Sequence, residues 1–243
     1  MFHRDLSSPQ HKTNVDLHYL LDRPPVGNSF FEHQTPSTEI IQPKDPSVHK
    51  PITQRQLLDK KLRWMTVGGQ YNWTDKVYPD EEPPEFPQDI KDLLSGLFPQ
   101  TTAEAAIVNL YSPGDTLSLH RDVSEECDQG LISISIGCDC LFIIGLDGKD
   151  NADTLAQPEL EHACDSNIKY HVFRLRSGDA VYMSGSSRFA WHGVPLIIPD
   201  TCPDELRSWP ASLTGECNED ENDHWRDWLS TKRVNLNVRQ MKA

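Results

Sequence analysis

From Ala105 to the C-terminus, apolar and polar residues alternate in short runs, which is the pattern of β-strands. The alternation is strict in residues 131–137, where leucine and serines share one side and three isoleucines the other. Similar runs occupy residues 105–111, 116–120, 140–146, 170–176, 180–184, 188–195 and 232–240. About eight short strands separated by turns predict a closed or double-sheet β architecture.

The first half of the chain has a different texture. Residues 1–58 are rich in proline, histidine and serine without a sustained period, and they predict an extended arm that packs on the body through Phe30, Phe31, Ile40 and Ile41. Residues 87–98 repeat apolar residues every three to four positions, which predicts one short amphipathic helix. The fold class is therefore mainly β, with one or two flanking helices.

The net charge of −14 argues against a protein that binds nucleic acid through general basicity. The acidity is concentrated in residues 147–167 and 198–228, which together carry 15 acidic and 3 basic residues. These two segments are predicted to be acidic inserts, and the nearly neutral remainder is free to carry a local basic face. The chain holds no apolar run of the roughly 18 residues that a membrane span needs, so we expect a protein of the cytoplasm, the nucleus or both.

The segment "LSLHRD" ends one of the predicted strands with His120 and Asp122 two residues apart. In an extended chain, these two side chains point to the same face. His192, in "FAWHGVP", would add a third ligand from another strand. Two histidines and one carboxylate suit Fe(II) with open coordination positions, although an ordinary strand end could also contain the first pair by chance.

The last predicted strand, "RVNLNVR", places Arg233, Asn235, Asn237 and Arg239 on one face. Such a polar face fits an edge strand exposed to solvent. It also fits an anion site, because two arginine forks can bind the two carboxylates of a small diacid such as 2-oxoglutarate.

Three segments in order, "NLYSPGDTLSLHRD", "SGSSRFAWHGVP" and "RVNLNVR", resemble the AlkB family of Fe(II)- and 2-oxoglutarate-dependent dioxygenases. "LRWMTVGGQYNWTDKVY" is similar to the branch related to the first human homologue. The resemblance implies a double-stranded β-helix (jelly roll) that uses Fe(II), 2-oxoglutarate and O2. The ligands that it implies for iron are His120, Asp122 and His192. The contacts that it implies for 2-oxoglutarate are Asn109, Tyr111, Arg233, Asn235 and Arg239, with Arg233 at the C5 carboxylate and Arg239 at the C1 end.

The resemblance also implies a nucleotide-recognition lid over residues 59–86, ahead of a dioxygenase core over residues 87–243. In this lid, Trp73 and Tyr78 are candidates to stack on an extruded base, although Trp73 could equally pack the lid. Arg188, four residues before His192, is expected to support the ligand strand.

By this resemblance, the function is oxidative demethylation of N-methylated bases in DNA or RNA, including tRNA or damaged DNA, with release of formaldehyde, succinate and CO2. The partner would be a single strand, a damaged duplex or RNA, and the protein a monomer. The acidic inserts would also suit a basic peptide, so a methyl-lysine demethylase stays open. A third hypothesis is an iron-independent lyase that opens abasic DNA through Lys76.

Overall fold

The computed structural model describes residues 12–21, 31, 37–72, 75–78, 82–146, 169–209 and 225–242. Strands dominate these residues, as the alternation of the sequence predicts. Short helices account for most of the other regular elements: η1 (Asn14–Leu17), α1 (Gln54–Gln56), η2 (Leu57–Lys61), α2 (Gln88–Leu97), η4 (Gly185–Ser187), α3 (Asp204–Arg207) and η6 (Leu229–Thr231). Among the described residues, no helix is long and apolar enough to cross a membrane.

Two antiparallel sheets form the body of the protein. The larger sheet has the order β3-β4-β11-β6-β9, with β3 (Trp64–Gly68), β4 (Ala105–Tyr111), β11 (Arg233–Arg239), β6 (Leu131–Gly137) and β9 (Ala180–Met183). The smaller sheet has the order β5-β10-β7-β8, with β5 (Leu117–His120), β10 (Trp191–Ile197), β7 (Cys140–Leu146) and β8 (Lys169–Leu175). Strands that are far apart in the sequence are thus neighbours in each sheet, as in a jelly roll. A separate pair joins β1 (Ile40–Ile41) to β2 (Ile52–Thr53).

The C-terminal strand β11 lies in the middle of the larger sheet rather than at its edge. Asn235 sits opposite Asn109 of β4 on one side and opposite Ser135 of β6 on the other. Every residue of β11 is buried. The interpretation of this segment as a solvent-exposed edge strand is therefore wrong. The polar face of β11 points into the interior of the protein.

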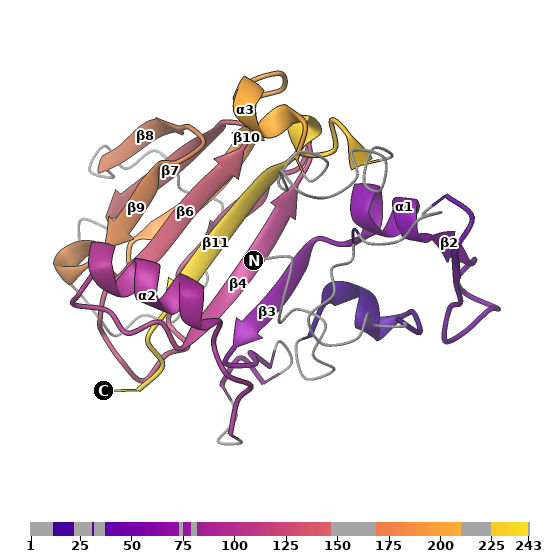
Figure 1. Ribbon diagram of the computed structural model, residues 1–243. Helices are drawn as coiled ribbons and strands as arrows, with labels where there is room; N and C mark the ends of the chain where they lie inside the picture. The colour runs from indigo at the N-terminus through magenta and orange to yellow at the C-terminus, as the bar shows by residue number, and fades with distance from the viewer. Residues whose placement is uncertain are drawn as a thin grey trace, which may run out of the picture.

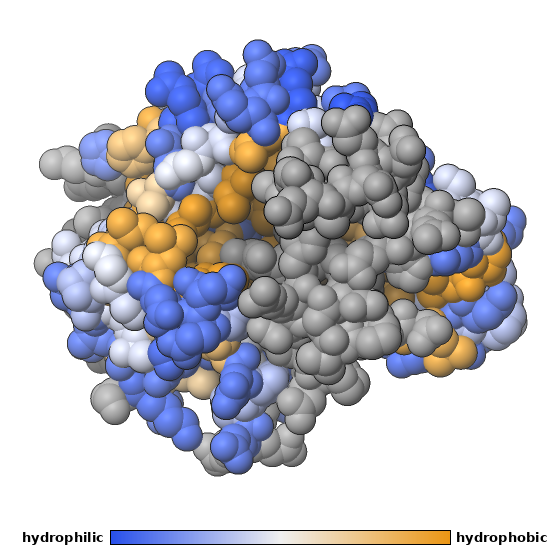
Figure 2. Space-filling view, in the orientation of Figure 1, coloured by the Kyte–Doolittle hydropathy of each residue, from blue (hydrophilic) through white to orange (hydrophobic). Residues whose placement is uncertain are grey.

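The outer face of the larger sheet carries the apolar half of each strand. Helix α2 crosses in front of this face in Figure 1. Its buried Ile90 and Leu94 belong to the same apolar cluster as Val108 and Val238 of the sheet. Figure 2 shows apolar residues gathered on this side of the molecule, in the region of β6 and β9. Part of the hydrophobic core thus covers the outer face of the larger sheet, opposite the polar residues of β11.

The N-terminal arm packs on the body, as the sequence predicts. Thr13 forms a bridge with Met65 of β3. The ring of Phe31 is 1% exposed and meets the rings of Trp225 and Trp228 at centroid distances of 5.2 and 4.9 Å. Ile41 also packs against the core, but Ile40 is 53% exposed, so its expected packing is wrong. Phe30 lies outside the described residues.

The first acidic insert connects β7 to β8, which pair along their full length from Cys140–Leu175 to Leu146–Lys169. Residues 147–168 of this insert and residues 210–224 of the second lie outside the described part of the chain. The proposed core boundary at residue 87 stays a prediction, although β3 lies upstream of it within the larger sheet.

Candidate active site

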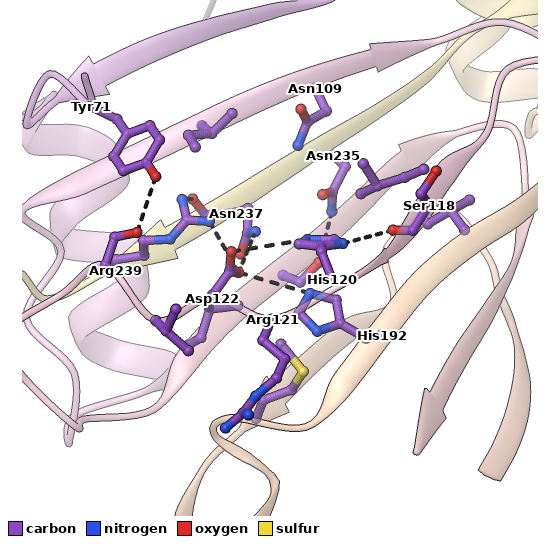
Figure 3. Close-up of a pocket in the computed structure, with 18 of the residues that line it drawn as sticks. Tyr71, Asn109, Ser118, His120, Arg121, Asp122, His192, Asn235, Asn237 and Arg239 are labelled. Atoms are coloured by element: carbon purple, nitrogen blue, oxygen red, sulfur yellow. Dashed lines mark hydrogen bonds and ion pairs between the residues drawn. The ribbon is translucent and has the colours of Figure 1, made fainter. Parts of the chain in front are cut away.

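A cavity of about 610 Å3 lies between the two sheets. Its lining comes from β4, β6, β9 and β11 of the larger sheet, from β5, β7 and β10 of the smaller sheet, and from the loop after β5. The predicted lid contributes Tyr71, Lys76 and Tyr78. Figure 3 shows the polar side chains of these strands converging on one point. The alternation of β11 turns its four polar residues toward the cavity, and apolar residues of the other strands, among them Leu131, Phe142 and Met183, complete the lining.

His120, Asp122 and His192 come together at that point, as the sequence predicts. Nε2 of His120 lies 4.0 Å from Oδ1 of Asp122, and Nε2 of His192 lies 3.8 Å from Oδ2 of Asp122. One ligand atom from each residue lies within 4.8 Å of the others. The pairing of β5 with β10 produces this arrangement because it sets His120 directly opposite His192.

Main-chain carbonyls decide which nitrogen of each histidine faces the metal position. Nδ1 of His120 lies 2.9 Å from the carbonyl oxygen of Ser118, and Nδ1 of His192 lies 3.0 Å from that of Ala190. A carbonyl oxygen can only accept a hydrogen bond, so Nδ1 of each ring donates it, and in the neutral form of each ring Nε2 presents the lone pair. The donor set therefore fits a divalent iron ion.

Asp122 is ionised in this environment. Burial raises its pKa, but the positive charge of Arg239, with those of His192 and His120 when protonated, outweighs burial and lowers the pKa to about 2. For His192, burial and the neighbouring His120 lower the pKa. A carboxylate and a neutral imidazole are the forms that bind a metal.

The far end of the cavity presents unpaired donors to an anion. Arg233 is 1% exposed, and its NH2 group donates to Oγ of Ser135 at 3.0 Å. Among the described residues, Nε and NH1 of Arg233 have no hydrogen-bond partner. A buried guanidinium with free donors is costly unless a carboxylate completes it, so this end of the cavity fits the distal carboxylate of 2-oxoglutarate.

The other residues implied for 2-oxoglutarate occupy different places. Asn109 and Asn235 line the cavity beside Arg233. Tyr111 is not among the lining residues; its ring supports Arg233, whose guanidinium carbon lies 5.3 Å from the ring centroid. Arg239 lines the cavity near the metal position, where its NH2 group lies 3.1 Å from Oδ2 of Asp122.

Two tyrosines form an aromatic wall on the lid side of the cavity. The rings of Tyr71 and Tyr78 are 5.3 Å apart, and the Tyr71 hydroxyl is hydrogen-bonded to Oγ of Ser124 at 3.0 Å. Burial raises the pKa of Tyr78 to about 12, so this phenol is neutral. Tyr78 thus lies where the sequence analysis expects a stacking residue, whereas Trp73 lies outside the described residues.

Three neighbours of the metal position were not identified as site residues from the sequence. Asn237 reaches the metal ligand itself, since its Nδ2 lies 3.4 Å from Oδ2 of Asp122. Glu125 and Ser124 follow Asp122 by three and two positions, and both line the cavity. The spacing H-x-D-x-x-E was visible in the sequence, but only the folded loop turns Glu125 back toward the metal ligands. Arg188 acts as the expected support, because it donates to the main-chain oxygens of Gln129 and Asp122.

Comparison with known proteins agrees with the geometry. The family model of the 2OG-Fe(II) oxygenase superfamily matches residues 17–239. The chain therefore belongs to this superfamily and, within it, to the AlkB family, and it is an Fe(II)- and 2-oxoglutarate-dependent dioxygenase.

Individual relatives place the chain in the ALKBH1 branch. It is 49% identical to the N6-methyladenosine RNA demethylase ALKB1 of Pyricularia oryzae, covering 100% of this chain and 69% of the relative. It is 47% identical to the N6-methyladenosine RNA demethylase ALKBH of Cryphonectria parasitica, covering 99% of this chain and 98% of the relative. The tRNA demethylase abh1 of Schizosaccharomyces pombe is 40% identical over 98% of this chain and 71% of that protein.

A solved structure confirms the fold. The structure of OsALKBH1 superposes on 73% of this chain and 77% of its own with a TM-score of 0.51 and 21% sequence identity. The jelly-roll architecture expected from the sequence is thus confirmed.

Proposed function

We propose that this protein removes the methyl group from N6-methyladenine in RNA, with release of formaldehyde, succinate and CO2. The observation that carries the proposal is the single cavity that joins a His-Asp-His metal position, an unpaired buried arginine and an aromatic wall. Two fungal relatives that this chain matches over at least 99% of its length carry this activity in their names.

The cavity has the size and chemistry for this task. Ligand cavities span roughly 300–1,000 Å3, and about 610 Å3 would hold an extruded base together with 2-oxoglutarate. Iron and 2-oxoglutarate, when bound, supply the oxidation of the N-methyl group. The chain itself binds the cosubstrate through Arg233, holds the metal through the triad, and offers the rings of Tyr71 and Tyr78 to the base.

The charges that line the cavity disfavour a methyl-lysine peptide. Asp122 and Glu125 are the acidic residues of the lining, and both form ion pairs with arginines. Lys76 and Arg121 line the same cavity and are exposed. The net positive charge would therefore repel a cationic methyl-lysine side chain, whereas it would not repel a neutral methylated adenine and would attract the phosphates of the strand.

The lyase hypothesis gains little from the structure. Lys76 does line the cavity, but its side chain is exposed to solvent. A lysine that forms Schiff bases is usually activated by desolvation or by a neighbouring cation. The dioxygenase function therefore remains the one that the geometry supports best.

The test supplies Fe(II), 2-oxoglutarate and air with matched oligonucleotides that contain N6-methyladenine in RNA or in DNA, with a trimethyl-lysine peptide, and with a DNA strand that contains an abasic site. Loss of the methyl mass and release of formaldehyde are measured, with His120→Ala and Asp122→Ala as controls. We expect demethylation of the RNA, abolished in both variants. Demethylation of the peptide alone, or cleavage of an abasic strand that survives in both variants, would contradict the proposal.

A further inference from the structure

Glu125 is a buried carboxylate that lies between two buried arginines. Its side chain is 2% exposed, and Oε2 lies 3.0 Å from NH2 of Arg188, whose side chain is also 2% exposed. Oε1 lies 2.8 Å from Nε of Arg239, whose side chain is 4% exposed. This second contact is held by charge, because Nε of Arg239 has no hydrogen-bond partner among the described residues. Glu125 thus joins two arginines that belong to different parts of the fold.

Both arginines also hold the same metal ligand. Arg239 places its NH2 group 3.1 Å from Oδ2 of the Asp122 side chain. Arg188 donates through NH1 to the main-chain oxygen of Asp122 at 2.9 Å. Asp122 is therefore held at its carboxylate by Arg239 and at its backbone by Arg188, and Glu125 pairs with both arginines. Figure 3 shows Arg239 beside Asp122 at the metal position.

The order of charges explains why Glu125 matters for the metal. Positive and negative groups alternate along Arg188, Glu125, Arg239 and Asp122, so the four buried charges cancel. Without Glu125, Arg239 would have Asp122 as its remaining carboxylate partner, and Arg188 would keep only main-chain oxygens. The uncompensated charge of Arg239 would draw the Asp122 carboxylate away from the histidines, and a metal ion would have to compete with it.

The network also connects the segments that carry the ligands. Glu125 lies in the loop after β5, which ends with His120, while Arg188 precedes β10, which carries His192. Arg239 is the last residue of β11. A carboxylate that ties these three segments fixes the separation of the ligands as well as the orientation of one of them.

We propose that Glu125 is a positioning residue of the metal centre. It holds Arg239 on Oδ2 of Asp122 and Arg188 on its main-chain oxygen, so that the carboxylate keeps the orientation in which Oδ1 faces His120 and Oδ2 faces His192. Partners of metal ligands commonly change metal affinity by about 10- to 100-fold when they are replaced. This role concerns metal binding alone and does not depend on which substrate the enzyme demethylates.

The test is a titration of metal-free protein with Co(II), followed by calorimetry, in the absence of nucleic acid and 2-oxoglutarate. Glu125→Gln keeps the shape of the side chain and removes its charge. We expect it to bind Co(II) about 10- to 100-fold more weakly than the unmodified protein. Asp139→Asn is the matched control, because Asp139 is also buried and paired with an arginine, Arg174, at 2.8 Å, but does not line the cavity. It should bind Co(II) normally.

Thermal unfolding of each variant separates positioning from simple stability. The proposal is overturned if Glu125→Gln binds Co(II) as tightly as Asp139→Asn while the two variants lose a comparable amount of Tm. If Glu125→Gln does not fold, Glu125→Asp and Arg188→Gln are measured instead. Glu125→Asp keeps the charge and is expected to retain more affinity for Co(II) than Arg188→Gln, and equal, unchanged affinities in both would overturn the proposal. Because no substrate is present, failure here leaves the proposed demethylation untouched, and failure of demethylation leaves this result untouched.

Discussion

Single neighbours decide the chemical state of each residue at the metal position. The carbonyl oxygens of Ser118 and Ala190 orient the two histidine rings, and Arg239 keeps the Asp122 carboxylate charged. Each neighbour is a group whose own protonation does not change near neutral pH. The centre is therefore set up for a metal before the metal binds.

The pKa values at this centre predict how the metal-free protein responds to acid. Burial and His120 lower the pKa of His192, so the unfolded chain takes up this proton first and stability falls as the pH drops below about 6.5. The charges around Asp122 hold its pKa at about 2 instead of 3.8. This stabilises the fold by about 2 kcal/mol above roughly pH 4, and the contribution is lost as the pH falls toward 2.

Urea unfolding of metal-free protein at about pH 8 and about pH 5 measures the first of these effects. His192→Gln should lose less stability than the unmodified protein between the two values. An equal loss in both proteins would show that His192 does not titrate as its burial predicts.

Arg233 is predicted to hold 2-oxoglutarate. Nε and NH1 of Arg233 are buried and have no hydrogen-bond partner among the described residues, so a bound carboxylate would complete them. Arg233→Gln should cost about 2–5 kcal/mol of binding free energy, which raises the Kd for 2-oxoglutarate by at least roughly 30-fold. Anaerobic calorimetry with Mn(II) present measures this Kd. Arg174→Gln, on the smaller sheet and outside the cavity, is the control, and an equal Kd in both variants would contradict the assignment.

At the scale of elements, the close approach of β5 to β10 sets the distance between the two histidines. Gly193 follows His192 on β10, and a Cβ placed there would lie 2.9 Å from the carbonyl oxygen of Leu117 and 3.2 Å from the amide nitrogen of Leu119. Both are backbone atoms of β5, so they can move away only if the strand itself moves. Glycine is therefore required for the two strands to lie this close.

Gly193→Ala should push β5 away from β10 and separate His120 from His192. Because metal ligands tolerate displacements of only about 0.5 Å, we expect Co(II) affinity to fall by roughly 10-fold or more. Gly96→Ala is the control: nothing lies within 4 Å of its Cβ, and it should stabilise α2 by up to about 1 kcal/mol without changing Co(II) binding. Normal Co(II) binding by Gly193→Ala would show that the strands can absorb a methyl group.

At the scale of the whole molecule, the charge near the cavity has the opposite sign to the net charge of the chain. The chain carries −14 overall, yet the exposed residues Lys76 and Arg121 lie at the cavity, one on the lid side and one beside His120. The guanidinium of Arg121 is held in place because its Nε donates to the main-chain oxygen of Phe189 at 2.7 Å. An acidic protein with cations at its active site should bind a single strand weakly and locally.

The salt dependence of RNA binding measures this arrangement. Each phosphate contact on a single strand contributes about −0.7 to the slope of log K against log salt concentration. Lys76→Gln and Arg121→Gln should each make the slope less steep by about 0.7. Lys91→Gln, on α2 across the larger sheet, should leave it unchanged. Slopes that do not differ among the three variants would place the phosphates elsewhere.

The sequence predicted most of the elements because their patterns are local. Alternation identifies a strand, and a three-to-four-residue repeat identifies α2, within a window of a few residues. His120 and Asp122 were recognisable as a pair for the same reason, since two residues of one strand share a face wherever the strand lies. His192 and Arg233 were candidates from their own strands, and the motif order then assigned them to the metal and to the C5 carboxylate by resemblance.

What the sequence by itself determined, therefore, is which side chains each strand turns to one face, the type of metal ligand available, and the family. The tertiary structure alone decided that β11 lies at the centre of its sheet, that His192 stands opposite His120, and that Glu125 bridges Arg188 and Arg239. The two Glu125 contacts join residues 63 and 114 positions apart in the chain. The geometry of all these contacts depends on strand order and packing rather than on any local pattern.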